Sequence, residues 1–203
     1  MTTYGTAEGA ARAAGRPRSA KAEKAIVDAV IDLMGEGITV SELTIEAVAA
    51  RAGVGKTTIY RRWSNKEDLV VDAMATLKAP LPPLPGTSVR DDLLVYLGAI
   101  HREVQDPRAR CVMGIAMSES ERHPRLVQRV HEVTIAPRRK VLRALLTRGV
   151  ATGELRHDLN VDIAMASVVG TMMWYMKWPH EDGVPGDLPA LITDELLTGM
   201  RAA

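Results

Sequence analysis

The chain has 203 residues with 26 basic and 25 acidic side chains, and its 46% hydrophobic content is ordinary for a globular protein with a substantial core. The single cysteine, Cys111, excludes an internal disulfide framework, a cysteine-based structural zinc site and an iron–sulfur cluster. No apolar run approaches the roughly 18 residues of a membrane helix, and the N-terminus lacks the apolar stretch of a signal peptide. We therefore expect a cytoplasmic protein, and the net charge of +1 by itself argues against a nucleic-acid partner.

The composition favours helices. There is no Phe, aromatic residues make up 3% of the chain, and Ala, Leu, Val and ten Met supply the apolar side chains. Ala, Leu and Met have high helix propensity, whereas strands favour aromatic and β-branched residues. Apolar residues recur at steps of three and four, which predicts an all-α fold of nine helices, at about 22–34, 44–52, 55–63, 64–77, 88–105, 107–121, 124–152, 161–178 and 188–201.

Three regions follow from this pattern. Residues 1–18 are rich in Ala, Gly and Thr without apolar periodicity and predict a flexible basic arm. The proline-rich stretch 79–86 cannot continue a helix, so it is the expected boundary between one domain at 19–79 and another at 80–203. Within the long helix at 124–152 the apolar stripe continues past Pro137, which predicts a kink there.

The distribution of charge changes the meaning of the near-neutral average. Residues 51–66 contain five basic side chains and no acidic one. The same segment spans the end of one helix, a turn at Gly53 and a second short helix. This length, with a glycine-containing turn between two helices, is typical of a helix-turn-helix. In such a motif the second helix enters the major groove of DNA.

The side chains of the second helix divide into two faces. Ile59 and Trp63 lie on one side of the helical wheel and are expected to pack inward. The other side carries types that contact base edges or phosphates, namely Lys56, Thr57, Tyr60 and Arg61. Two further candidates, Thr44 and Lys66, begin the flanking helices, where backbone N–H groups attract phosphate. Arg16 and Arg18 of the arm are candidates for an adjacent minor groove.

These motifs resemble the DNA-binding domain of the tetracycline-repressor (TetR) family of bacterial transcription regulators. The resemblance covers about residues 20–78 and is carried by the segments TIEAVA (44–49), AGV (52–54), TIYRRW (58–63) and KEDL (66–69). Two positions depart from the family pattern, with Gly55 where a Ser cap is common and Trp63 where Phe is usual. By resemblance, the residues at DNA-contacting positions are Thr44, Lys56, Thr57, Thr58, Tyr60, Arg61, Arg62 and Lys66.

The resemblance also implies a C-terminal domain that forms a homodimer and binds a small molecule, here an apolar one. Small and apolar residues in the last two helices predict a four-helix dimer interface, with candidates Ala164, Ser167, Val168, Thr171, Leu191 and Leu196. The candidates for the lining of an effector cavity are Tyr96, Ile100, Met113, Met117, Val130 and Met173. The expected function is that of a repressor released from a palindromic double-stranded DNA operator by its ligand.

Two alternatives remain at this stage. A DNA-binding regulator or architectural protein without an inducer would have the same helix-turn-helix. A nucleotide-binding enzyme is more remote: residues 50–57 nearly match a phosphate-binding loop, with Asp72 downstream, but such a loop follows a strand and residues 44–52 have helical periodicity. The histidines are not spaced as metal ligands on one helix and no catalytic constellation is visible, so neither a cofactor, a metal nor catalytic residues are expected.

Overall fold

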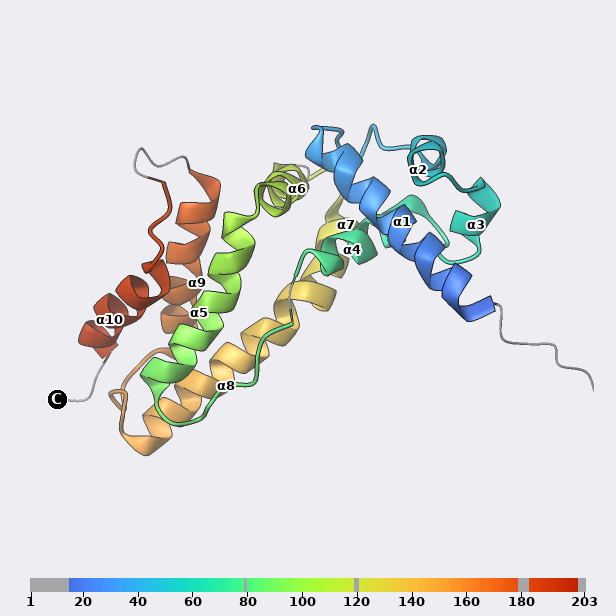
Figure 1. The fold of residues 1–203 in the computed structure, drawn as a ribbon. Coiled ribbons are helices and arrows are strands. Elements are labelled where there is room, and N and C mark those ends of the chain that lie inside the picture. The colour runs from blue at the N-terminus through green and yellow to red at the C-terminus, as the bar shows by residue number, and fades with distance from the viewer. Residues whose placement is uncertain (1–14, 79, 119–120, 179–182, 201–203) are drawn as a thin grey trace, which may run out of the picture.

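The computed structural model describes residues 15–78, 80–118, 121–178 and 183–200, and within these ranges the chain is helical and contains no β-strand (Figure 1). The N-terminal unit comprises α1–α4 and the remaining helices form the C-terminal unit (Figure 1). The helices are α1 (Gly15–Gly35), α2 (Ile45–Ala52), α3 (Lys56–Tyr60), α4 (Lys66–Thr76), α5 (Val89–Gln105), α6 (Pro107–Ser118), α7 (Pro124–Val130), the π-helical η1 (His131–Ile135), α8 (Ala136–Thr152), α9 (Val161–Lys177) and α10 (Leu188–Met200). Because α7, η1 and α8 are continuous, the described ranges contain the nine predicted helices.

Local capping explains several helix ends. The Thr44 hydroxyl accepts a hydrogen bond from the Ala47 N–H at 3.1 Å at the start of α2, and Ser88 caps α5 in the same way through Asp91. Gly53 ends α2 with φ at 66°, a left-handed conformation that glycine adopts at little cost. These ends were predicted from the sequence.

Other boundaries differ from the prediction. Helix α1 begins at Gly15, so the arm is shorter than expected at its C-terminal side; a proline is tolerated in the first turn, where no intrahelical donor is needed. The residue that caps α4 is Asn65, whose side chain accepts from the Asp68 N–H, and not Ser64. Helix α3 ends at Tyr60, and a turn in which the N–H groups of Arg62 and Trp63 bond to the Ile59 carbonyl replaces its predicted last residues.

The long helix does not simply bend at Pro137. A five-residue π-helical turn, η1, precedes this proline, which occupies the first turn of α8. Proline provides no N–H to the preceding turn, and both prolines and π turns are known sites of kinks in long helices. The Thr134 hydroxyl donates to the Val130 carbonyl at 2.6 Å within this turn.

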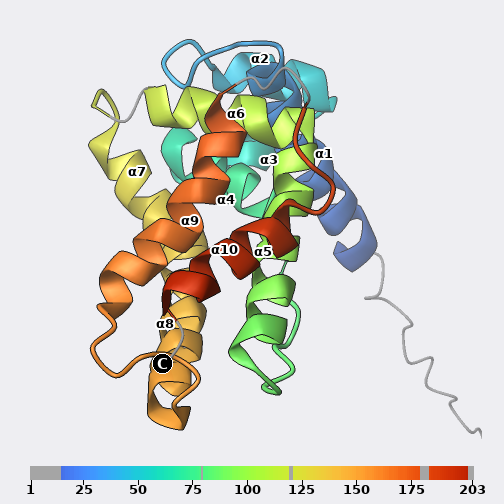
Figure 2. The same ribbon diagram turned by 90° about the vertical axis from the view of Figure 1, so that its left-hand side faces the viewer.

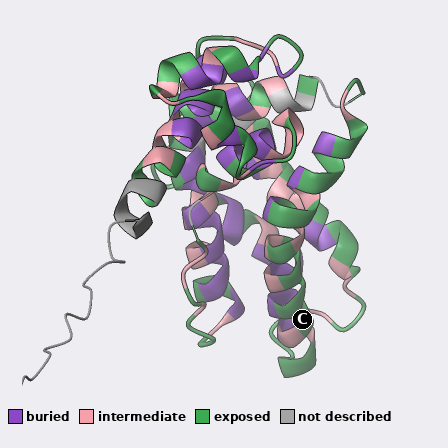
Figure 3. Ribbon diagram, turned by 90° about the vertical axis from the view of Figure 1, so that its right-hand side faces the viewer, coloured by how far each residue is buried: buried purple, intermediate pink, exposed green. Residues whose placement is uncertain are grey.

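The apolar core has two parts, visible as buried residues in both halves of the molecule (Figure 3). The N-terminal core is formed by α1–α4 and also by Val112 of α6 and Leu126 and Val130 of α7. The C-terminal core is formed by α5, α8, α9 and α10, with α9 and α10 forming the outer layer (Figure 2). The chain boundary near residue 79 is therefore not the boundary between the two cores, because α6 and α7 pack against the N-terminal unit.

None of the helices in the described ranges is long and apolar enough to cross a membrane.

Candidate nucleic-acid interface

Helices α2 and α3 form the predicted helix-turn-helix. Ala49 of α2 and Ile59 of α3 are buried and pack in the N-terminal core, and the turn between the helices contains the left-handed Gly53. Helices α1 and α4 supply most of the remaining core, so α3 lies at the edge of the molecule on a packed support (Figure 1). This support fixes which side of the short helix faces outward.

The outward side of α3 is the recognition face, which we define as Lys56, Thr57, Tyr60 and Arg61. All four residues are exposed, and Tyr60 keeps 55% of its surface accessible although it is a large aromatic residue. The structure thus brings together the four residues that the helical wheel placed on one face. Thr58 is half-buried behind them.

The flanking candidates occupy different positions. Thr44 is exposed at the start of α2 and already uses its hydroxyl to cap that helix. Lys66 is half-buried, and its Nζ donates to the Ser41 carbonyl at 3.2 Å. Arg62 turns toward α1, where its Nε lies 3.3 Å from a Glu23 carboxylate oxygen and only 15% of its side chain is exposed. The side chains of Arg16 and Arg18 lie outside the described residues.

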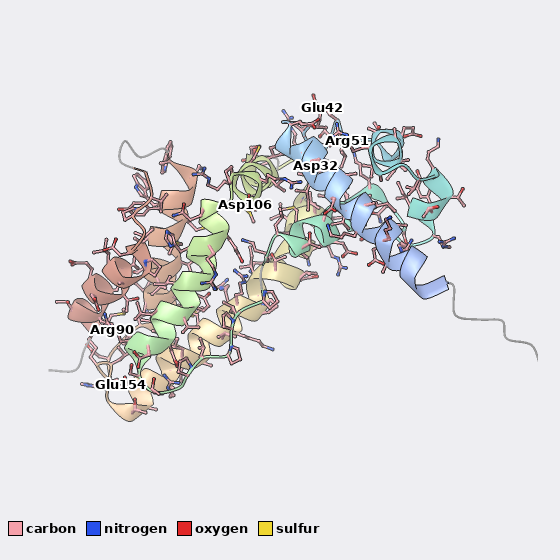
Figure 4. All side chains as sticks on the ribbon, viewed as in Figure 1. Asp32, Glu42, Arg51, Arg90, Asp106 and Glu154 are labelled. Carbon is pink, nitrogen blue, oxygen red and sulfur yellow. The ribbon has the colours of Figure 1, made fainter. Side chains whose placement is uncertain are left out.

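Acidic side chains from outside the basic segment modify its charge. Lys56 Nζ lies 2.8 Å from Glu46 Oε1 of α2, and this hydrogen bond raises the pKa of Lys56 and lowers that of Glu46. Arg51 forms a bidentate pair with Glu36 at 2.8 and 3.0 Å, at the end of α1 away from α3 (Figure 4). In the fold, acidic side chains from outside residues 51–66 therefore lie beside the basic side chains of this segment. The sequence did not indicate that Glu46 and Glu36 would be these partners.

Trp63 is 5% exposed and belongs to the N-terminal core, as predicted. Its Nε1–H donates to Asp72 Oδ2 of α4 at 2.8 Å. Asp72 thus has a structural partner, and the segment before Gly53 is the helix α2. A phosphate-binding loop requires a strand in that place, so the structure does not support the nucleotide-binding alternative.

The described candidates for an effector site are divided between the two cores. Tyr96 is 2% exposed in the C-terminal core, with its hydroxyl 3.5 Å from the Arg138 carbonyl, and Ile100 packs against the same core. Val130 and Met113 pack in the N-terminal core instead. Met173 lines a separate cavity of about 350 Å³ between α9 and the η1–α8 rod. The side chain of Met117 is outside the described residues.

The dimer candidates are divided between two sides of α9 and α10. Ala164 and Val168 are buried in the C-terminal core, where the helical repeat turns them inward with Met172, so within one chain they do not lie on the exposed side of α9. Ser167, Thr171 and Leu196 are half-buried, and Leu191 is 47% exposed.

The sequence analysis did not identify the most exposed large apolar side chains of this region. The outer face of α9 exposes Ile163, Ala166, Gly170 and Trp174, at steps of three and four, and Trp178 follows. Trp174 is 58% exposed, and its ring centroid lies 5.8 Å from that of Trp178. The available signal was that α9 is apolar on all sides, which indicates burial on both faces.

Two family models match the chain. The model described as bacterial regulatory proteins, tetR family, matches residues 39–73, which include the helix-turn-helix. The model described as tetracyclin repressor-like, C-terminal domain, matches residues 84–196.

Relatives agree with these models. The HTH-type transcriptional regulator YdeS of Bacillus subtilis is 29% identical over 162 residues, which cover 79% of this chain and 80% of YdeS. The DNA-binding transcriptional repressor TetR of Mycobacteroides abscessus is 28% identical over 163 residues, covering 78% and 83% of the two chains. The structure of the regulator FadR from Bacillus subtilis in complex with stearoyl-CoA has the same fold, with a TM-score of 0.68 at 20% identity over 86% of this chain and 95% of FadR.

Proposed function

The chain belongs to the TetR family of bacterial transcriptional regulators, and we propose that it represses transcription as a homodimer that a small molecule releases from a palindromic operator. The observation that carries the DNA-binding part is the exposed recognition face on α3, where two cations, a threonine and a tyrosine hydroxyl point away from a packed core. Such side chains contact base edges and phosphates in the major groove.

The outer face of α9, together with exposed Leu191 of α10, is the proposed dimer interface. Large apolar residues at this density are uncommon on a monomer surface, and small residues between them allow helices to approach closely. A two-fold axis through this face pairs two recognition helices. The operator should then contain inverted half-sites separated by about 34 Å or a small multiple of it.

Ligand release is proposed by analogy with relatives. FadR, which shares the fold, was solved in complex with stearoyl-CoA, so that protein binds a small molecule. A regulator that binds DNA without an inducer is the second candidate function, and it predicts that operator affinity is independent of added metabolites.

Selection of bound fragments from genomic DNA at fixed salt tests DNA recognition. We expect a palindromic consensus, and Arg61→Gln should weaken binding to it by about tenfold or more. Arg51→Gln removes the same charge from a side chain held by Glu36 away from α3, and it should leave the affinity nearly unchanged. Equal losses for the two variants would contradict the assignment of the recognition face.

Sedimentation equilibrium tests the dimer. Trp174→Glu places a charge in the outer face of α9 and should produce monomers at concentrations where the parent chain is dimeric. The control is Val127→Glu on α7, which adds the same charge at an exposed apolar position elsewhere. A monomeric parent chain at all concentrations would refute the interface.

A further inference from the structure

A second cavity lies where the N-terminal and C-terminal units meet. This junction cavity, of about 280 Å³, is open to solvent and is bordered by the end of α4, the proline-rich connection and the segment formed by η1 and α8. Its apolar wall includes Leu81, Val133 and Val141, and its polar wall includes Lys78, Arg138 and Thr134. The volume lies just below the range of about 300–1,000 Å³ that is typical of small-molecule sites, and a mixed wall of this kind suits a small amphiphile.

The two cations of this wall share one buried carboxylate. Glu103 of α5 has 6% of its side chain exposed, and its Oε2 lies 3.0 Å from Lys78 Nζ and 3.1 Å from Arg138 Nη1. A second Arg138 nitrogen donates to Glu103 Oε1. Lys78 and Arg138 are themselves 20% and 13% exposed, so the three charges form a largely dehydrated triad behind the cavity. Buried charges of this kind are stable only while they are paired.

The triad ties together three elements that are distant in sequence. Lys78 follows α4, which connects directly to the helix-turn-helix, whereas Glu103 and Arg138 belong to the C-terminal unit. The π turn η1 forms the neighbouring wall through Val133 and Thr134, and π turns within α-helices occur frequently at functional sites. A ligand here would touch both units at once.

We propose that the junction cavity is an effector site for a small organic acid with an apolar body. Its carboxylate would share Lys78 and Arg138 with Glu103, so that each cation is drawn partly away from Glu103 while this buried carboxylate keeps its partners, and its body would contact Leu81, Val133 and Val141. Weakening of the Lys78–Glu103 bridge loosens α4 from α5 and changes the position of the N-terminal unit, which lowers operator affinity. This inference rests on the proposed ligand-responsive function and supplies its ligand class and location.

Calorimetric titration of the full chain with 2-naphthoate tests the site directly and requires no DNA. We expect saturable binding, and about tenfold or greater weakening for the uncharged isostere 2-naphthamide, because a hydrogen bond to a charged group is lost. Lys78→Gln and Arg138→Gln should each weaken naphthoate binding to a similar extent. Lys140→Gln, an exposed change on the same helix α8, is the matched control and should have no effect.

Glu103→Gln gives the most specific readout, because removal of the competing carboxylate should strengthen naphthoate binding. A merely structural role for Glu103 predicts no gain. If a cation variant does not fold, Val133→Trp decides the question, since a bulky side chain at this exposed rim position should block naphthoate and leave the triad in place.

Absence of naphthoate binding up to about 1 mM, equal affinity for the amide, or binding insensitive to both cation variants and to Val133→Trp would overturn the site. Binding at the cavity without release of a selected DNA fragment would overturn its role as an effector site. Retention of that fragment without naphthoate is measured separately. A failure of this inference is therefore distinguishable from a failure of the proposed DNA-binding function.

Discussion

The helix caps of the N-terminal unit and the side-chain contacts that join the helices of the C-terminal unit differ in their range along the chain. In the N-terminal unit, the caps of α2 and α4 come from residues three positions away. In the C-terminal unit, the Val89 N–H donates to Glu154 Oε2 across 65 residues, and Arg90 pairs with Asp194 across 104, at the end of the molecule far from α3 (Figure 4). Residues close together in the sequence therefore set the helices that present the recognition face. The C-terminal core depends on packing between helices that are far apart in the sequence.

Gly149→Ala should give the largest stability change, because it disturbs the close packing of α8 against Val89 of α5 and against Leu155. A Cβ at this position would lie 2.4 Å from Val89 Cγ2 and 2.9 Å from Leu155 Cδ1. We expect a loss of about 1–3 kcal/mol in the free energy of unfolding, measured by urea denaturation. The control Gly114→Ala in α6, where a Cβ meets nothing within 4 Å, should be neutral or stabilise by up to about 1 kcal/mol. Similar results for both would mean that α5 and α8 separate readily.

Trp63→Phe probes the N-terminal core with a smaller change. A smaller aromatic ring remains buried, and the change removes both the hydrogen bond from Nε1 to Asp72 and part of the packing of the indole. Asp72 is exposed and regains water, so we expect a loss of only about 1 kcal/mol in the same assay. Asp72→Asn keeps an acceptor and should cost less. An unchanged stability of Trp63→Phe would show that this bond is not a net contributor.

Glu46→Gln should raise operator affinity severalfold at low salt, with little effect on stability. The change frees Lys56 and removes a negative charge beside the recognition face. Glu36→Gln is the matched control, since it removes the same charge from the Arg51 pair. Fluorescence anisotropy with the selected operator measures both, and the difference should diminish at high salt. A loss of affinity in Glu46→Gln would indicate that Glu46 positions Lys56 for DNA.

His101→Gln should have the smallest effect, which is confined to the pH dependence of stability. Burial lowers the pKa of His101 on α5, although a hydrogen bond with the Pro185 backbone opposes this and Arg102 adds to it. Below about pH 6.5 the unfolded chain takes up this proton more readily than the folded chain, so stability falls from pH 7 to pH 5. The variant should show a smaller fall in melting temperature over this range. An identical fall in both proteins would assign it to other groups.

Sequence periodicity was enough to predict which helices form, but not which side of each helix is covered. For α3 the assignment was correct, because one side carries Ile59 and Trp63 and the other carries polar residues. For α9 the predicted interface face included Ala164 and Val168, which are buried in the core of the chain itself. Both sides of that helix are apolar, so side-chain hydrophobicity alone could not distinguish the core side from the exposed side. The effector candidates are dispersed for a related reason, since Tyr96 and Val130 belong to different cores.

The sequence by itself determined the helical class, the helix-turn-helix and the recognition face, because capping, periodicity and side-chain polarity act over a few residues. Only the tertiary structure decided the division of the core, the pairing of Lys56 with Glu46, the apolar outer face of α9 and the triad of Lys78, Glu103 and Arg138. These features join residues that the sequence separates, and a charge or an apolar side chain acquires its role from the partner that the fold places beside it.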